Sequence, residues 1–295
     1  MQLQFNSSIR AAAAPVSWGV MEETDTSVWP EATRVIEEIA AAGYEGTELG
    51  PFGYYPTQPL PLRSALERHD LTLTSAFVPL RWFQPDLLPS DLESLMKVAR
   101  LLSVLECPYV VVADWVAAPG ESPPNDTAWR AAAVAMETAA RQLQASRLQL
   151  VFHLEAGSHL ATPDDEARLC ALTDPELVGI CLDTGHYAYS FGSPRDAVRQ
   201  YGQRIRYVHL KDVDPVVRER VGQQGLDFYA AVRAGVFSPL GKGCADIAGV
   251  VADLLSIGYH GWIVAEQDIL LPVPPPQAPL ENARVSRAFL RQLGI

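Results

Sequence analysis

Short apolar runs alternate with longer amphipathic segments along most of the chain. The apolar runs are rich in Val, Ile and Leu, as expected of strands that are buried on both faces. They predict strands at residues 10–18, 44–49, 71–78, 107–113, 148–154, 177–182, 205–210 and 261–265. The amphipathic segments predict helices at residues 29–42, 60–69, 91–105, 128–146, 163–172, 194–201, 246–257 and 281–293.

Strands and helices that alternate in units of about 35 residues indicate an α/β protein and match the (β/α)8 TIM barrel. Such a barrel is usually one domain, so we expect residues 1–295 to form a single domain. The alternative is a doubly wound open sheet. Its dinucleotide-binding form carries GxGxxG after the first strand, whereas this chain has APVSWG at residues 14–19. The barrel is therefore the expected fold.

One connection is much longer than the others. Residues 213–243 separate the seventh predicted strand from its helix, and they contain helical stretches at 216–223 and 228–234. Connections in such units usually span about two to six residues. An insertion of this length is more often a lid or a specificity element than filler. It could also mediate formation of a homo-oligomer, and the sequence leaves that choice open.

The amino-acid composition disfavours some classes of binding partner. The net charge of −12 opposes binding to a phosphate backbone, so nucleic acid is not an expected partner. No apolar run reaches the roughly 18 residues of a membrane span, and the N-terminal MQLQFNSSIR lacks the regions of a secretory signal. The four cysteines are scattered without CxxC spacing, which favours buried free thiols. We expect a cytoplasmic protein without a membrane partner.

Residues that bind metals stand at the ends of the last four predicted strands. Glu155, Asp183, His209 and Glu266 each follow an apolar run. In a closed barrel these ends meet on one face, where the active sites of this fold lie. Three carboxylates and one imidazole suit a single divalent cation such as Mn²⁺, Co²⁺ or Mg²⁺. Zn²⁺ is a further candidate, although thiolates or several histidines would suit it better.

Three more polar residues lie close to these ends. Lys211 follows His209 by two residues on the same side of the strand, where a nearby cation would lower the pKa of Lys211 and make it a proton donor or acceptor. A salt bridge to a neighbouring aspartate is the alternative. His186 is a candidate acid or base. The side chain of His153 points to the same side of its strand as that of Glu155. It either lines the site or lies deeper in the barrel.

Aromatic residues gather at or just after the predicted strand ends, and they suit the apolar face of a sugar or cyclitol ring. Plain packing is the alternative for each of them. The residues that we expect to contact substrate are Trp18, Glu48, Tyr54, His153 and Trp115.

Several motifs resemble the xylose-isomerase-like barrel superfamily of sugar isomerases, epimerases and AP endonucleases. They are LDTGH at 182–186, VHLKDVDP at 208–215, PLGKG at 239–243 and GYHGWIVAEQD at 258–268. APVSWG at 14–19 and TELGPFGYYPT at 47–57 add a resemblance to the inosose dehydratases of inositol catabolism. The resemblance implies one divalent metal, held by the four residues named above. Those dehydratases tend to carry His where this chain has Glu155. The endonuclease branch uses a basic groove, which the charge of this chain disfavours.

The resemblance and the strand-end residues together predict a metal-dependent lyase. It would dehydrate a cyclic keto-polyol such as scyllo-inosose, with Glu155 or Glu266 as the base and Lys211 or His186 as the acid. A ketose 3-epimerase or sugar isomerase that uses the same metal site is the first alternative. A sugar-binding barrel without turnover is the second. In each case the partner is a small cyclitol or sugar.

Overall fold

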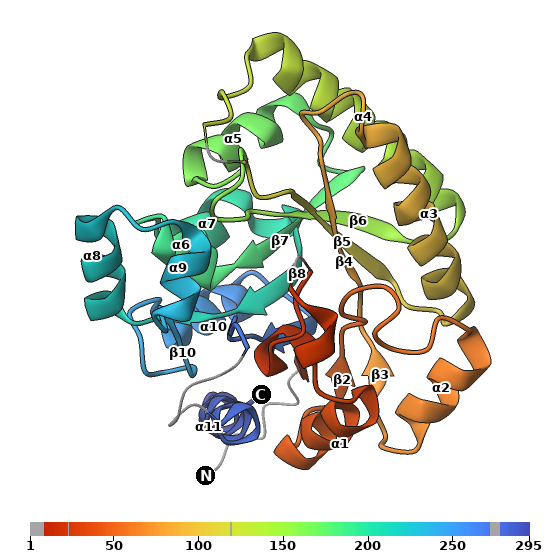
Figure 1. Ribbon diagram of the computed structural model, residues 1–295, viewed down its shortest axis with the longest axis vertical. Helices are drawn as coiled ribbons and strands as arrows, with labels where there is room; N and C mark the ends of the chain where they lie inside the picture. The colour runs from red at the N-terminus through yellow and green to blue at the C-terminus, as the bar shows by residue number, and fades with distance from the viewer. Residues whose placement is uncertain (1–8, 23, 119, 272–277) are drawn as a thin grey trace.

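The computed structural model describes residues 9–22, 24–118, 120–271 and 278–295 (Figure 1). Its strands are β1 (Ile9–Ala13), β2 (Gly46–Thr47), β3 (Thr72–Leu73), β4 (Phe77–Leu80), β5 (Tyr109–Asp114), β6 (Gln149–His153), β7 (Val178–Asp183), β8 (Ile205–Leu210), β9 (Asp212–Val213), β10 (Phe237–Ser238) and β11 (Gly261–Ala265). Its α-helices are α1 (Ala32–Ala42), α2 (Pro59–Glu67), α3 (Leu88–Val104), α4 (Asp126–Ala145), α5 (Pro163–Leu172), α6 (Thr184–Tyr189), α7 (Pro194–Tyr201), α8 (Pro215–Gln224), α9 (Phe228–Arg233), α10 (Ile247–Ser256) and α11 (Pro279–Gln292). Three short 3-10 helices are η1 (Pro15–Trp18), η2 (Thr26–Val28) and η3 (Gly202–Arg204).

The parallel sheet closes into a barrel. Its nine strands are ordered β3-β2-β1-β11-β8-β7-β6-β5-β4, so β3 and β4 stand at the two ends. These two strands are consecutive pieces of one extended segment. Between them, the carbonyl of Ser75 accepts the N–H of Leu49 at 3.0 Å, and the carbonyl of Ala76 accepts the N–H of Val111 at 2.9 Å. The segment therefore bonds to both sides and joins the sheet ends. Helices cover the outside (Figure 1), and the predicted (β/α)8 fold is confirmed.

Side chains alternate between the two faces of each strand, so the barrel interior is apolar and its C-terminal mouth is polar. A buried cluster inside the barrel includes Val151 of β6, Cys181 of β7, Tyr207 of β8 and Val264 of β11. Residues two positions further along a strand face the same side. Those positions are His153, Asp183, His209 and Glu266. The alternation that packs the barrel interior thus also delivers the polar residues to its C-terminal mouth.

A bulge keeps β7 and β8 in phase. Ile180 pairs with Ile205, but Cys181 pairs with Tyr207, so β8 has one extra residue, Arg206. Gly179 accommodates this side chain, because an added Cβ there would lie 2.8 Å from Cγ of Arg206. Without the extra residue, the side chains of β7 that face the interior would pair with outward-facing ones of β8. With it, Asp183 pairs with His209.

The structure corrects three predicted boundaries. The first strand ends at Ala13 instead of reaching Trp18, because Pro15 cannot donate to a strand ladder and begins η1. The third predicted strand is divided into β3 and β4 by the closing bend. Helix α3 begins at Leu88, before the predicted start at residue 91.

The insertion is fastened to the barrel through Asp212. The carboxylate of Asp212 accepts backbone N–H groups from Val213, Gly241, Gly243 and Ala245 at 2.9 to 3.0 Å. Gly243 must be glycine for this approach, because an added Cβ would lie 2.4 Å from the carboxylate. The two helices predicted in the insertion are present as α8 and α9. Strand β10 pairs antiparallel with β9 and ties the insertion beside the mouth.

Two compositional expectations can be checked against the described residues. All four cysteines are free, but Cys244 is exposed and Cys170 is only partly buried, because the loop before α10 and one side of α5 face solvent. No helix in the described ranges is both long and apolar enough to cross a membrane.

A buried carboxyl group on α5 gives a prediction for stability. Glu166 is 1% exposed, and neither of its carboxyl oxygens has a hydrogen-bond partner in the described part of the chain. Burial raises the pKa of Glu166 to about 8. As pH rises from about 5 to 8, the unfolded chain releases this proton while the folded chain retains it. The free energy of unfolding therefore falls by up to about 1.4 kcal/mol per pH unit on account of this group.

Glu166→Gln should remove this pH-dependent fall in the free energy of unfolding. We expect the free energy of unfolding of the variant, relative to the parent, to increase steadily between pH 5 and pH 8 in urea unfolding experiments. Glu93→Gln, at an exposed position on α3, serves as the control and should follow the parent. Parallel curves for parent and Glu166→Gln would contradict the interpretation.

Candidate active site

A cavity opens at the C-terminal mouth of the barrel. Of the residues predicted from the sequence to form the site, those that line it are Glu48, Trp115, His153, Glu155, His186, His209, Lys211 and Glu266. Asp183 lies just beneath them and is fully buried. Side chains from β6, β7, β8 and β11 therefore meet at one place, as the barrel requires.

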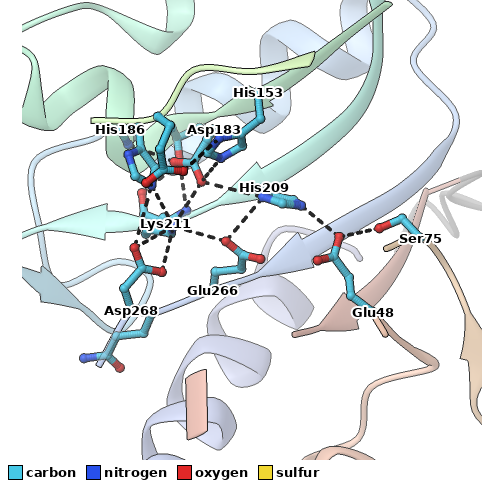
Figure 2. Close-up of polar contacts among 12 residues, drawn as sticks. Glu48, Ser75, His153, Asp183, His186, His209, Lys211, Glu266 and Asp268 are labelled. Carbon is cyan, nitrogen blue, oxygen red and sulfur yellow. Dashed lines mark hydrogen bonds and ion pairs between the residues drawn. The ribbon is translucent and has the colours of Figure 1, made fainter. Parts of the chain in front are cut away.

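Asp183 stands at the centre of the polar cluster (Figure 2). Its Oδ2 lies 3.3 Å from Nε2 of His153, 3.7 Å from Nδ1 of His209 and 3.3 Å from Nζ of Lys211. Its Oδ1 accepts the backbone N–H of His186 at 2.8 Å and caps the N-terminus of α6. This cap holds the carboxylate in one orientation, with Oδ2 toward the imidazole and ammonium groups.

Two glutamates flank this centre. Oε2 of Glu266 lies 3.3 Å from Nδ1 of His209 and 3.1 Å from Nζ of Lys211. Oε2 of Glu155 lies 3.3 Å from Nδ1 of His153, and its Oε1 lies 3.8 Å from Nε2 of His186. Burial would raise the pKa of Glu266, but His209 and Lys211 hold it at about 2. Glu266 is therefore ionised.

Several groups of side chains at the mouth are arranged so that they could hold a divalent cation. Ligand atoms of His153, Asp183 and His209 lie within 4.8 Å of one another, and so do those of Glu48, His209 and Glu266. Nδ1 of His153 and Nδ1 of His209 lack a hydrogen bond of good geometry within the described residues, although a carboxylate oxygen lies 3.3 Å from each. Carboxylates and imidazoles that face one another without bonding are groups that one cation can bridge.

Lys211 is surrounded by carboxylates. Besides Asp183 and Glu266, its Nζ contacts Asp268 at 2.8 Å, and the residue is 2% exposed. Burial would lower the pKa of Lys211, but Asp183, Asp268 and Glu266 raise it well above its ordinary value. In the metal-free protein Lys211 is thus an ammonium ion. Its ion pairs go to these strand-end carboxylates and not to the sequence-adjacent aspartates.

Asp268 is a further polar residue at the mouth, beyond those predicted from the sequence. It lies two residues beyond Glu266, so strand alternation places it on the same side, and that spacing could have identified it. It is 5% exposed, and its two carboxylate oxygens lie 2.8 and 3.0 Å from Nζ of Lys211. Burial raises the pKa of Asp268 to about 7, although Lys211 opposes the shift.

His186 is a neutral imidazole. Its Nδ1 accepts the backbone N–H of Ala156 at 2.9 Å, so the neutral ring carries its proton on Nε2. That atom lies 3.2 Å from Nζ of Lys211 and also faces Glu155 and Asp268, at 3.8 and 3.7 Å. Burial lowers the pKa of His186 to about 4. His186 can therefore donate a hydrogen bond from Nε2, whereas Lys211 is the better proton donor of the two candidates.

Two residues that were expected to contact substrate do not line the cavity. The indole N–H of Trp18 donates to Oε2 of Glu38 at 2.6 Å, because η1 turns the side chain toward α1. The hydroxyl of Tyr54 donates to the carbonyl of Pro30 at 3.0 Å, and its ring stacks on Tyr55. Both are committed to packing at the side of the barrel.

The insertion contributes aromatic walls that the sequence analysis did not assign. Phe228 and Tyr229 of α9 line the cavity. The ring of Phe228 lies 5.4 Å from that of His186, and the ring of Phe237 lies 5.2 Å from Nζ of Lys211. These rings shield the polar cluster from solvent on that side. The connection length predicted a functional element, but no local signal identified which residues turn inward.

Residues 36–293 match the family described as xylose isomerase-like TIM barrel. An inosose dehydratase of Geobacillus kaustophilus is 31% identical over 297 residues, which cover 96% of this chain and 94% of that protein. The rhizopine catabolism protein MocC of Rhizobium meliloti is 30% identical over 298 residues, which cover 97% of this chain and 89% of that protein.

Solved structures share the fold at lower identity. A D-psicose 3-epimerase solved in the presence of D-fructose has a TM-score of 0.73 at 15% identity and covers 96% of this chain and 99% of its own. The probable 3-DHS dehydratase AsbF from Bacillus anthracis has a TM-score of 0.71 at 14% identity, with coverages of 96% and 98%. At such identities the likeness shows the fold alone.

Lys211→Met should destabilise the metal-free protein. The substitution leaves Asp183, Glu266 and Asp268 without their shared ammonium, and breaking a buried ion pair on one side typically costs about 3–5 kcal/mol. Urea unfolding with EDTA present measures this loss. Lys97→Met, at an exposed position on α3, is the matched control. A loss no larger than that of the control would show that the carboxylates do not depend on Lys211.

Proposed function

The chain belongs to the xylose isomerase-like TIM barrel family, and we propose that it is a divalent-metal-dependent lyase that dehydrates a cyclic keto-polyol of the scyllo-inosose type. Relatives named inosose dehydratase, which align over nearly the full chain, support this substrate class. The cytoplasmic location and the oligomeric state stay predictions.

One observation favours dehydration over epimerisation. Epimerisation needs a base and an acid that exchange one proton at carbon, which two carboxyl groups can do. Dehydration also needs a donor that protonates a departing hydroxyl. The ammonium of Lys211 stands 3.1 to 3.3 Å from carboxylates of two proposed metal ligands, Glu266 and Asp183. A proton donor therefore lies within reach of any hydroxyl that sits beside the metal.

Glu155, Asp183, His209 and Glu266 would hold the metal. A bound divalent cation would polarise the substrate ketone and acidify the neighbouring C–H group. His153 lies 3.3 Å from both Asp183 and Glu155 and would orient them. The aromatic rings of Phe228 and Trp115 border the cavity and would pack on the apolar face of the ring.

Glu155 is the favoured base. Its side chain is 14% exposed, whereas those of Glu266, His209 and Asp183 are 6%, 1% and 0% exposed. An oxygen of Glu155 would take the proton from the carbon beside the ketone, and the electron pair of that C–H bond would form a C=C bond. The C–O bond of the β-hydroxyl would break as Lys211 gives it a proton, and water would leave. His186 would donate a hydrogen bond from Nε2 to a substrate oxygen.

The leading proposal predicts ultraviolet absorbance from an enolised diketone when Mn²⁺-loaded protein is incubated with scyllo-inosose. EDTA should abolish the signal, and Glu266→Gln should lower the rate by at least about 100-fold, because an essential metal ligand and its charge are changed. Glu67→Gln, at an exposed position on α2, should behave as the parent. Bound metal without this absorbance, together with epimerised ketoses in a substrate panel, would favour the epimerase alternative. Metal and sugar binding without any turnover would favour the non-catalytic barrel.

Lys211→Arg tests the acid separately from the base. Arginine keeps a cation among the carboxylates, but a guanidinium does not give up its proton in proteins. We expect elimination to fall by about 10²- to 10⁴-fold. Exchange of the carbon-bound hydrogen with solvent deuterium, followed by NMR, should continue because Glu155 remains. Equal losses of elimination and exchange would contradict the assignment of Lys211 as the acid.

A further inference from the structure

Glu48 lies behind one of the proposed metal ligands (Figure 2). Its Oε1 is 2.9 Å from Nε2 of His209 and 2.7 Å from Oγ of Ser75. Glu48 and His209 are 2% and 1% exposed, and Ser75 is fully buried. Ser75 belongs to the bend that closes the barrel, so the position of Glu48 is fixed by the closure itself. A buried carboxylate oxygen with two donors is held in one orientation.

A metal-bound His209 is neutral, and these contacts then select one of its two tautomers. A carboxylate oxygen only accepts hydrogen bonds, so the hydroxyl of Ser75 and Nε2 of His209 both donate to Glu48. With its proton on Nε2, the neutral ring has its lone pair on Nδ1. That atom faces Oε2 of Glu266 at 3.3 Å and Oδ2 of Asp183 at 3.7 Å. It lacks a hydrogen bond within the described residues.

We propose that Glu48 is a positioning residue that fixes His209 with Nδ1 toward the cation, rather than a residue that contacts substrate. Without an acceptor at Nε2, the ring could carry its proton on Nδ1 and bond to Glu266 or Asp183, which would remove a metal ligand. Carboxylates that accept from the outer nitrogen of a ligand histidine commonly contribute 10- to 100-fold, in order of magnitude, to metal affinity. This inference rests on the proposed metal site and is independent of the substrate.

Metal affinity tests the role directly. Mn²⁺ binding, measured by competition with a fluorescent chelator, should weaken about 10- to 100-fold in Glu48→Leu. Glu48→Gln should lose less, because its amide oxygen can still accept from Nε2. Glu166→Gln, a buried glutamate outside the site, should bind as the parent. Parent-like affinity in Glu48→Leu would overturn the proposal. Complete loss in Glu48→Gln, equal to that in Glu266→Gln, would instead make Glu48 a ligand and overturn it as well.

A spectroscopic test needs no variant and therefore does not depend on the folding of one. Long-range ¹H–¹⁵N spectra of the Zn²⁺-loaded parent should show His209 with a proton on Nε2 and the metal shift on Nδ1. A metal shift on Nε2 would overturn the proposal. Neither measurement uses turnover, so a protein that binds metal as expected yet fails to dehydrate scyllo-inosose would refute the proposed reaction and leave the role of Glu48 intact.

Discussion

The mouth of the barrel gathers buried carboxylates around the ammonium of Lys211. Asp183, Glu266 and Asp268 each lie within 3.3 Å of it, in a region almost without solvent access. Buried carboxylates that repel one another remain ionised only when cations lie among them. Lys211 is one such cation. The imidazoles of His153 and His209, which face these carboxylates, are suitable ligands for a metal as a second cation. This electrostatic requirement explains both the stability and the proposed reactivity of the site.

Three features of the backbone bring these charged groups together. Period-two alternation turns the functional residues inward above an apolar floor. The bulge at Arg206 keeps Asp183 beside His209. The bend at Ser75 closes the barrel and also donates to Glu48, which contacts His209 from behind. Closure of the fold and orientation of a ligand are therefore linked through the same short segment.

Much of this arrangement followed from the sequence, because strand ends in a parallel barrel must converge. The fold, the segments of β6, β7, β8 and β11 and the convergence of their terminal residues could be predicted in that way. The partners of Glu48 and Lys211 could not, since a contact across the barrel depends on register, and the bulge that sets the register leaves no local signal. The side chains of Trp18 and Tyr54 lie outside the cavity, because a 3-10 turn that begins at Pro15 and a hydrogen bond to Pro30 direct them elsewhere, and neither feature is evident from the strand pattern.

The proposed chemistry depends on one divalent cation that binds among Glu155, Asp183, His209 and Glu266. Anomalous diffraction from crystals grown with Mn²⁺ tests it most directly, because it locates the metal without reference to any substrate. We expect a single strong anomalous peak within bonding distance of these four side chains, with Nδ1 as the ligand atom of His209. A peak elsewhere in the molecule, or none at saturating Mn²⁺, would contradict it.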